Sequence, residues 1–366
     1  MKKRGLLCVS MVLLMIVMLF SVGCSNSSNT DSNAPTDSGN AKQNEKPIEL
    51  SFAGLMPAAS PWETKVMVPL LAEIDKETNG RVKITTYPGG TLLEGGKIYD
   101  GVAIGAADMG HESLSWVNGR FLVSDILKKS GVPFKSGYAA SYTFRDLVGE
   151  LDPKEFHDVK VLMLICTGPG NLHTTKPVRT LEDLAGMEIR CIGSDAPSLT
   201  ALGAKPVSMS HQDGYEALQK GIVQGTLASD ETLQTWHNAE VTKYTTLMPF
   251  MYNGLQAIVM NLDTWNSLPK DVQDGIERAC DKIWKDIVVH FFDNESSIGL
   301  KYAVEKTGQE VIELTPEETK RWKDRIAHIL DDYAEELDQK GLPGKEAKKL
   351  LFELGEKYNE EYDKLK

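Results

Sequence analysis

Gly186-Met187-Glu188-Ile189-Arg190-Cys191 is the stretch of this 366-residue chain that says most about its fold. Apolar residues at positions 187, 189 and 191 alternate with polar residues at 188 and 190, which is the period of a β-strand with one covered face. We therefore expect Arg190 to point away from the core side of the strand. A guanidinium held there matches a carboxylate in a bidentate manner, which lysine does not. The alternative is a surface arginine paired weakly with a nearby acid.

Outward from this strand, the pattern indicates an α/β architecture throughout. Strands are expected at 48–53, 81–87, 159–166 and 256–260, and helices at 61–79, 97–104, 211–220 and from 269 toward 290. Thr180 and Asp183 form a capping-box-like pair, and Thr315 precedes a clear helix start. Two charged C-terminal helices are expected on either side of Gly341-Leu342-Pro343-Gly344.

The N-terminus has the form of an export signal. Met1-Lys2-Lys3-Arg4 is followed by an apolar stretch from 6 to 20, which is too short to span a bilayer. Ser21-Val22-Gly23-Cys24 then looks like a lipoprotein box, although Ser21 stands where a leucine is usual. We predict a lipoprotein signal peptide at 1–23, with the protein anchored by lipid on Cys24 to the outer face of the membrane. An ordinary cleaved signal is the alternative.

Residues 24–47 are polar and almost free of apolar side chains, so we expect a disordered tether between lipid and domain. Removing residues 1–23 removes three basic residues and no acid, which leaves 37 basic against 52 acidic residues and takes the net charge from −12 to −15. Such an acidic chain is an unlikely partner for nucleic acid.

The cysteines and the standard catalytic motifs give no enzyme signature. Five cysteines occur in the whole chain, with no CxxC spacing, so neither a disulfide framework nor a zinc site is expected. Buried thiols are expected at Cys166, Cys191 and Cys280, and one bridge plus one free thiol is the alternative. Gly95-Gly96-Lys97-Ile98 lacks the pattern of a phosphate loop, and Gly168 to His173 fails as a dinucleotide fingerprint. We predict no catalytic residue, cofactor or metal, while an exported hydrolase with a dispersed triad stays a minor alternative.

The Arg190 strand is the first piece of a longer pattern. Together with Leu202-Gly203-Ala204-Lys205-Pro206-Val207 and the segment from Tyr215 to Gly225, it resembles the signature of solute-binding proteins of tripartite ATP-independent periplasmic (TRAP) transporters. Asn79 to Gly90, Gly105 to Met109, and Asn261 to Pro269 look like further segments of that family, in the same order.

This resemblance implies a two-lobed clamp of the type II periplasmic-binding-protein kind, with a long helix spanning both lobes. The first lobe would comprise 48–165 and 256–290. The second would comprise 166–255 and 291–366, including the C-terminal helices.

The resemblance also implies a ligand site in the cleft between the lobes. Arg190 matches the family arginine that pairs with the ligand carboxylate. The segment from 108 to 113 corresponds to a first-lobe loop facing the cleft, which makes His111, Glu112 and Ser113 candidates for polar contacts.

Two positions depart from the family pattern. His173 lies where some members carry a second arginine, and Ala228 replaces an asparagine that touches the ligand, so Asp230 or Ser229 is expected to line the cleft instead. Trp116, Trp236 and Asn253 fall in or near cleft-lining stretches. For His173 and the aromatic residues, ordinary core packing is the alternative.

The sequence thus predicts an extracytoplasmic binding protein that captures an organic acid and delivers it to the membrane permease subunits of a TRAP-type transporter. Hinge closure would be its mechanism. A binding protein of an ABC importer, or a sensor, is the alternative within the same class.

Overall fold

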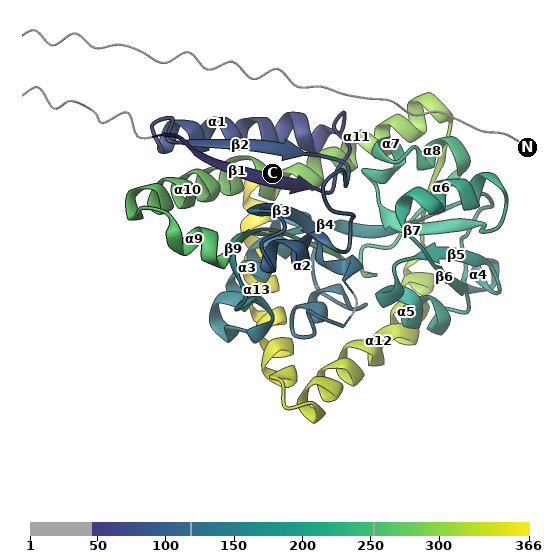
Figure 1. Cartoon of the computed structure of the whole chain (residues 1–366). Helices are drawn as coiled ribbons and strands as arrows, with labels where there is room; N and C mark the ends of the chain where they lie inside the picture. The colour runs from purple at the N-terminus through teal and green to yellow at the C-terminus, as the bar shows by residue number, and fades with distance from the viewer. Residues whose placement is uncertain (1–45, 118, 252) are drawn as a thin grey trace, which may run out of the picture. The chain divides into compact units, whose positions relative to one another are not determined.

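The computed structural model describes residues 46–117, 119–251 and 253–366, which form a mixed α/β fold (Figure 1). The predicted signal peptide (1–23), the lipidation site Cys24 and the tether up to residue 45 lie outside the described residues. Among the helices that are described, none combines the length and apolar character needed to cross a bilayer.

The strands form two groups joined by β4. The first group runs in the order β2 (Val82–Tyr87), β1 (Ile48–Gly54), β3 (Met109–Ser113), β9 (Asn253–Asn261) and the first part of β4 (Val159–Thr174). The second runs in the order β6 (Lys205–Ser208), β5 (Glu188–Cys191), β7 (Gly225–Ser229), the end of β4, β8 (Tyr244–Leu247) and β10 (Glu310–Glu313). Figure 1 shows β4 passing from one group to the other.

Pairing directions within the groups explain where a site can form. β1 is parallel to β2 and β3, and β5 is parallel to β6 and β7, whereas β9 and β4 run antiparallel to their neighbours. In open α/β sheets, ligands bind outside the carboxyl ends of the parallel strands. A ligand site is therefore expected at the loops after β1, β3, β5 and β7.

β4 is longer than the sequence predicts. The expected strand at 159–166 continues to Thr174, straight through Gly168-Pro169-Gly170. The pairing with β9 changes register between Cys166 and Pro169. A proline lacks the N–H that a regular ladder needs, and a bulge tolerates it.

One long helical segment contacts both groups of strands. It consists of α10 (Lys270–Ile283), a π-helical turn (Trp284–Val288) and α11 (Val289–Thr307). α10 packs on α1 (Val68–Glu77), which follows a π-helical turn at Glu63–Met67. α11 packs on α3 (Gly137–Leu151), α7 (Thr232–Thr235) and α8 (Asn238–Val241). The predicted helix spanning both halves is confirmed, and it ends at Thr307.

The remaining helices are short except at the C-terminus: α2 (Ile98–Ala103), α4 (Leu181–Leu184), α5 (Ala196–Ala201), α6 (His211–Gln219), α9 (Leu262–Ser267), α12 (Pro316–Gln339) and α13 (Gly344–Leu365). The capping box at Thr180 and Asp183 is confirmed, as is the Thr315 cap of α12.

The C-terminal helices differ from their predicted assignment to the second lobe. The first half of α12 buries Trp322 and Ile326 in the core that includes the apolar side chains of β5. Further along the helix, Leu330 and Ala334 belong to the core around α3. α13 packs on α3, with Leu351 and other apolar residues in that same core. The apolar stripe of α12 therefore passes from one core to the other, and α13 belongs with the first.

Candidate functional site

A small cavity lies where the carboxyl ends of strands from both groups meet. It is lined from the first group by Leu55, Met56, Ser113, Trp116, Thr167, Gly254 and Gln256, and from the second by Ile192, His211, Ser229, Glu231 and Trp236. Leu55, Ser113, Ile192 and Ser229 end or directly follow β1, β3, β5 and β7. The cavity therefore occupies the place that the strand directions favour for a ligand.

The cavity adjoins a wider groove. Leu55, His211 and Trp236 line both the cavity and a neighbouring groove of ≈ 920 Å³. The rings of His211 and Trp236 stack with their centroids 5.5 Å apart. The cavity itself has a volume of ≈ 40 Å³, which is room for about three water molecules. An organic ligand can enter only if this wall moves or the two halves separate.

Arg190 lies on β5 next to this cavity and is fully buried. Ile189 and Cys191 on either side face the core, as the alternation predicts. The Nε of Arg190 donates to the Met209 carbonyl oxygen at 3.0 Å, and its Nη1 lies 3.2 Å from Nδ1 of His211. A surface arginine is therefore wrong for Arg190: its guanidinium is fixed behind His211, which itself lines the cavity.

The ring of His211 presents a donor to the cavity. Burial first, and then the Arg190 charge, holds its pKa well below the ordinary value, so the ring is neutral. Because guanidinium can only donate, Nδ1 of His211 accepts and the ring proton is on Nε2. Gly214 on α6 allows this approach, since a Cβ there would lie 3.3 Å from the aliphatic stem of Arg190.

His111 lies behind the cavity and orients one of its lining residues. Its ring is fully buried, stacks on Trp62 at 4.3 Å and places Nε2 2.7 Å from the Gln256 side-chain oxygen. Burial lowers the pKa of His111 to about 4, so the ring is neutral and Nε2 donates. The amide nitrogen of Gln256 is thereby left as the donor of that side chain.

Glu112 is directed away from the cavity. It is fully buried, and its carboxylate accepts from the backbone N–H groups of Ile98 at 2.9 Å and Ser113 at 2.8 Å. Burial raises its pKa to about 7 against the opposing effect of these hydrogen bonds. The Glu112 carboxylate thus pairs with the backbone N–H of Ile98 at the start of α2 and with that of Ser113. It is not among the proposed ligand contacts.

His173 and Asp230 lie behind the cavity as well. The ring nitrogens of His173 are 3.0 Å from the Thr245 hydroxyl and 3.2 Å from the Ala228 carbonyl oxygen, and burial lowers its pKa to about 4. Asp230 accepts from the Asn171 amide at 3.0 Å through both oxygens, and burial raises its pKa to about 6. Neither residue lines the cavity, because both are engaged between β4, β7 and β8.

Ser113, Trp116 and Trp236, which the sequence analysis singled out, do line the cavity, and so does Ser229, the alternative to Asp230. Asn253 begins β9, and its side chain lies outside what the structure describes. Sequence reasoning missed Glu231, Gln256 and His211. Ser210 caps the helix that begins at His211, but a cap marks only the start of a helix, so no local signal identified these three as site residues.

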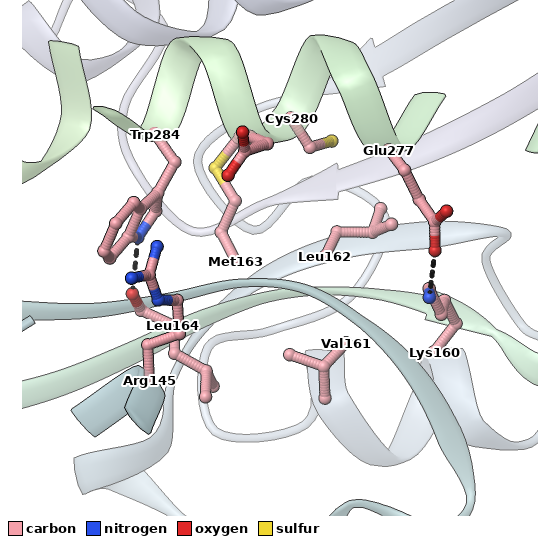
Figure 2. A pocket seen from close by; sticks show the side chains of 10 residues that line it. Arg145, Lys160, Val161, Leu162, Met163, Leu164, Glu277, Cys280 and Trp284 are labelled. Atoms are coloured by element: carbon pink, nitrogen blue, oxygen red, sulfur yellow. Dashed lines mark hydrogen bonds and ion pairs between the residues drawn. The ribbon is translucent and has the colours of Figure 1, made fainter. Parts of the chain in front are cut away.

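A separate hollow of ≈ 300 Å³ lies between β4 and α10, shown in Figure 2. Lys160 faces Glu277 there at 2.5 Å, and the Trp284 indole donates to the Leu164 carbonyl oxygen at 2.7 Å. This hollow shares no residue with the cavity. Within the described ranges, no cluster of three or more His, Cys, Asp or Glu side chains could hold a metal ion.

Comparison with known proteins places the chain among solute-binding proteins. Residues 52–336 match the family described as bacterial extracellular solute-binding protein, family 7. A C4-dicarboxylate-binding periplasmic protein of Rhodobacter capsulatus is 26% identical over 298 residues, which cover 80% of this chain and 88% of that protein.

Solved structures agree with this placement. A TRAP periplasmic solute-binding protein from Desulfovibrio salexigens is 34% identical, with a TM-score of 0.74 over 85% of this chain and 96% of that one. A TRAP solute-binding protein from Rhodoferax ferrireducens, in complex with copurified benzoate, has a TM-score of 0.79 over 86% of this chain and 99% of its own. At 22% identity, this second likeness establishes the fold alone.

Proposed function

The chain belongs to the family 7 bacterial extracellular solute-binding proteins, and from this premise we propose that it captures a small organic acid and delivers it to a TRAP-type membrane permease. The observation that carries the proposal is Arg190, a fully buried guanidinium fixed at the end of a strand beside the cavity. The relatives support the ligand class, since one is named for C4-dicarboxylates and another holds benzoate.

Arg190 and His211 together form the proposed anion site. The guanidinium supplies the charge, and the Met209 carbonyl fixes its orientation before the ligand arrives. The Nε2 proton of His211 adds a neutral donor in the wall of the cavity. Ser113 and the Gln256 amide are further polar groups in the lining. The ligand would thus exchange water for preformed donors.

Access requires the wall of Leu55, His211 and Trp236 to open, because the cavity holds only ≈ 40 Å³. We propose that the free protein opens by a hinge in the segments that join the two groups of strands. The lobe boundaries at 165/166 and 255/256 stay part of this proposal, with α13 assigned to the first lobe. Lipid on Cys24 would keep the clamp beside the permease.

Identification of the copurified ligand tests the proposal. Protein expressed in its exported form is analysed by native mass spectrometry, and the released small molecule is identified after denaturation. We expect an organic acid at one molecule per chain, displaceable by the same acid in isotopically labelled form. Retention of a neutral sugar or a metal chelate in its place would overturn the proposed ligand class.

A further inference from the structure

Glu231 is a buried acid in the lining of the proposed ligand cavity. It follows β7 directly after Asp230 and is 9% exposed. Its Oε1 accepts from the Ser229 hydroxyl at 2.8 Å, and its Oε2 accepts more weakly from Ser296 of α11 at 3.4 Å. A carboxylate has about four acceptor positions, and the two hydroxyls together with the backbone N–H of Glu231 itself do not occupy all of them.

The surroundings of Glu231 hold no cation to balance its charge. Across the described ranges, no lysine, arginine or histidine forms an ion pair with it. The acid that acts on it is Asp230 in its own segment. Across the cavity, His211 is neutral. Burial, with a further contribution from Asp230, raises the pKa of Glu231 to about 7.

We propose that the ligand carries a protonated amine besides its carboxylate, and that Glu231 binds this amine while Arg190 and His211 bind the carboxylate. The ligand class is then an amino acid or a related zwitterion. This inference rests on the proposed function. It adds the group that the same site binds at the other end of the ligand.

Two features of the cavity favour an ammonium group. A buried carboxylate is costly unless it is paired, and a ligand cation that enters with its own counter-charge supplies the partner. The indoles of Trp116 and Trp236 line the same cavity, and aromatic faces attract cations. Glu231 lines the cavity itself after β7, whereas Arg190 on β5 reaches it through His211.

The competing chemistry is a protonated Glu231 that donates to an oxygen atom of a plain or hydroxylated acid. The two cases differ in proton balance. An ammonium ligand favours the ionised carboxylate, so binding near pH 7 releases protons. A ligand oxygen favours the protonated carboxyl, so binding takes protons up.

Calorimetry with matched ligands tests the inference on the full mature chain. The probes are α- and ω-amino acids, each with the 2-hydroxy or ω-hydroxy acid and the unsubstituted acid of the same carbon skeleton. Titrations in phosphate and in Tris at pH 7 report the protons exchanged. The variants are Glu231→Gln and, as a surface control, Glu353→Gln on α13, which is exposed.

We expect an amino acid to bind at least 10-fold more tightly than its hydroxy and unsubstituted counterparts, with proton release. Glu231→Gln should remove at least 10-fold of that affinity and change binding of the unsubstituted acid less than 3-fold, whereas Glu353→Gln should change neither. Preferential binding of plain or hydroxy acids, with proton uptake, overturns the inference and leaves the proposed function intact. Failure of every acid to bind overturns both.

Discussion

At the scale of single residues, Arg190 shows how a strand can hold a buried, oriented guanidinium for a ligand. Its neighbours on β5 face the core, so the strand itself is anchored by apolar packing. Its guanidinium is oriented by Met209 and His211, and its stem is covered by Gly214. A donor that is already desolvated and oriented loses little conformational entropy and hydration when the ligand binds. A buried arginine therefore suits a transport receptor.

We predict that Arg190→Lys weakens carboxylate binding, because ammonium keeps the charge and loses the planar fork. Loss of a desolvated charge-assisted pair costs about 2 to 5 kcal/mol, or about 30-fold to several-thousand-fold in affinity. Arg190→Ala should show the full loss and Arg190→Lys only part of it, by calorimetric titration. Circular dichroism and thermal melting check that both variants are folded. Wild-type affinity in the lysine variant would contradict the role given to Arg190.

Glu231→Gln should stabilise the free protein in a pH-dependent manner. The folded-state pKa of Glu231, about 7, lies above the ordinary value of 4.5, so its stabilising contribution is complete below pH 4.5 and is lost as pH rises through 7. At pH 8.5 the wild type therefore carries a penalty on the order of 3 kcal/mol that the glutamine variant lacks. Ligand-free melting temperatures should diverge at pH 8.5 and converge toward pH 5. Equal differences at both pH values would show that Glu231 does not titrate as described.

At the scale of elements, α11 positions the acidic segment after β7. The helix approaches so closely that a Cβ at Gly299 would lie 2.3 Å from the Asp230 carbonyl oxygen and 3.0 Å from Cα of Glu231. Ser296, one turn earlier on the same face, reaches the Glu231 carboxylate. The absence of a side chain at Gly299 is therefore what lets the long helix support the cavity lining.

Gly299→Ala should destabilise the fold, because either α11 or the 230–231 segment must shift, at about 1 to 3 kcal/mol. Gly149→Ala on α3 is the matched control, since no atom lies within 4 Å of its added Cβ. That substitution should stabilise by about 0.5 to 1 kcal/mol through helix propensity. Chemical denaturation measures both changes. Similar effects in the two variants would contradict the close packing of α11.

The elements themselves differ in how far the sequence could predict them. Periodic and capping patterns predicted the strand at Arg190 and the capped starts of α4 and α12 correctly. β4 extended beyond its predicted end because a bulge accommodates Pro169, and a bulge depends on the partner strand. The roles of Glu112 and His173 were hidden because the groups they bond come from α2, β7 and β8, distant in sequence. Glu231 lines the cavity because its segment packs on α11, and such a long-range contact has no local pattern in the sequence.

At the scale of the whole molecule, the N-terminal prediction concerns attachment to the membrane. Cys24→Ala should release the protein into the soluble extracytoplasmic fraction, because stable anchoring requires more than one acyl chain and the variant has none. Fractionation with immunoblotting, and mass spectrometry of the mature N-terminus, measure this. Cys280→Ala, a change at a buried thiol far from the N-terminus, should leave the fraction unchanged. A wild-type protein that is already soluble, with its N-terminus elsewhere, would refute lipidation.

The two groups of strands are joined by β4 and contacted by the α10–α11 segment, and in the proposed function they form a clamp that encloses an acid beside Arg190. The cavity in this structure has a volume of only ≈ 40 Å³, and in the proposed clamp it is taken as the closed arrangement. Opening exposes the walls contributed by Leu55, His211 and Trp236 to solvent. Closure on a ligand should therefore shrink the molecule while leaving its secondary structure unchanged.

Small-angle X-ray scattering of the mature chain, titrated with the acid that copurifies, tests this account most directly. The ligand-free protein should have a larger radius of gyration than the described residues of this structure, and saturating acid should reduce it. Arg190→Ala should stay expanded at the same acid concentration. Superimposable profiles of the wild type with and without acid, at a concentration where calorimetry shows saturation, would contradict the clamp.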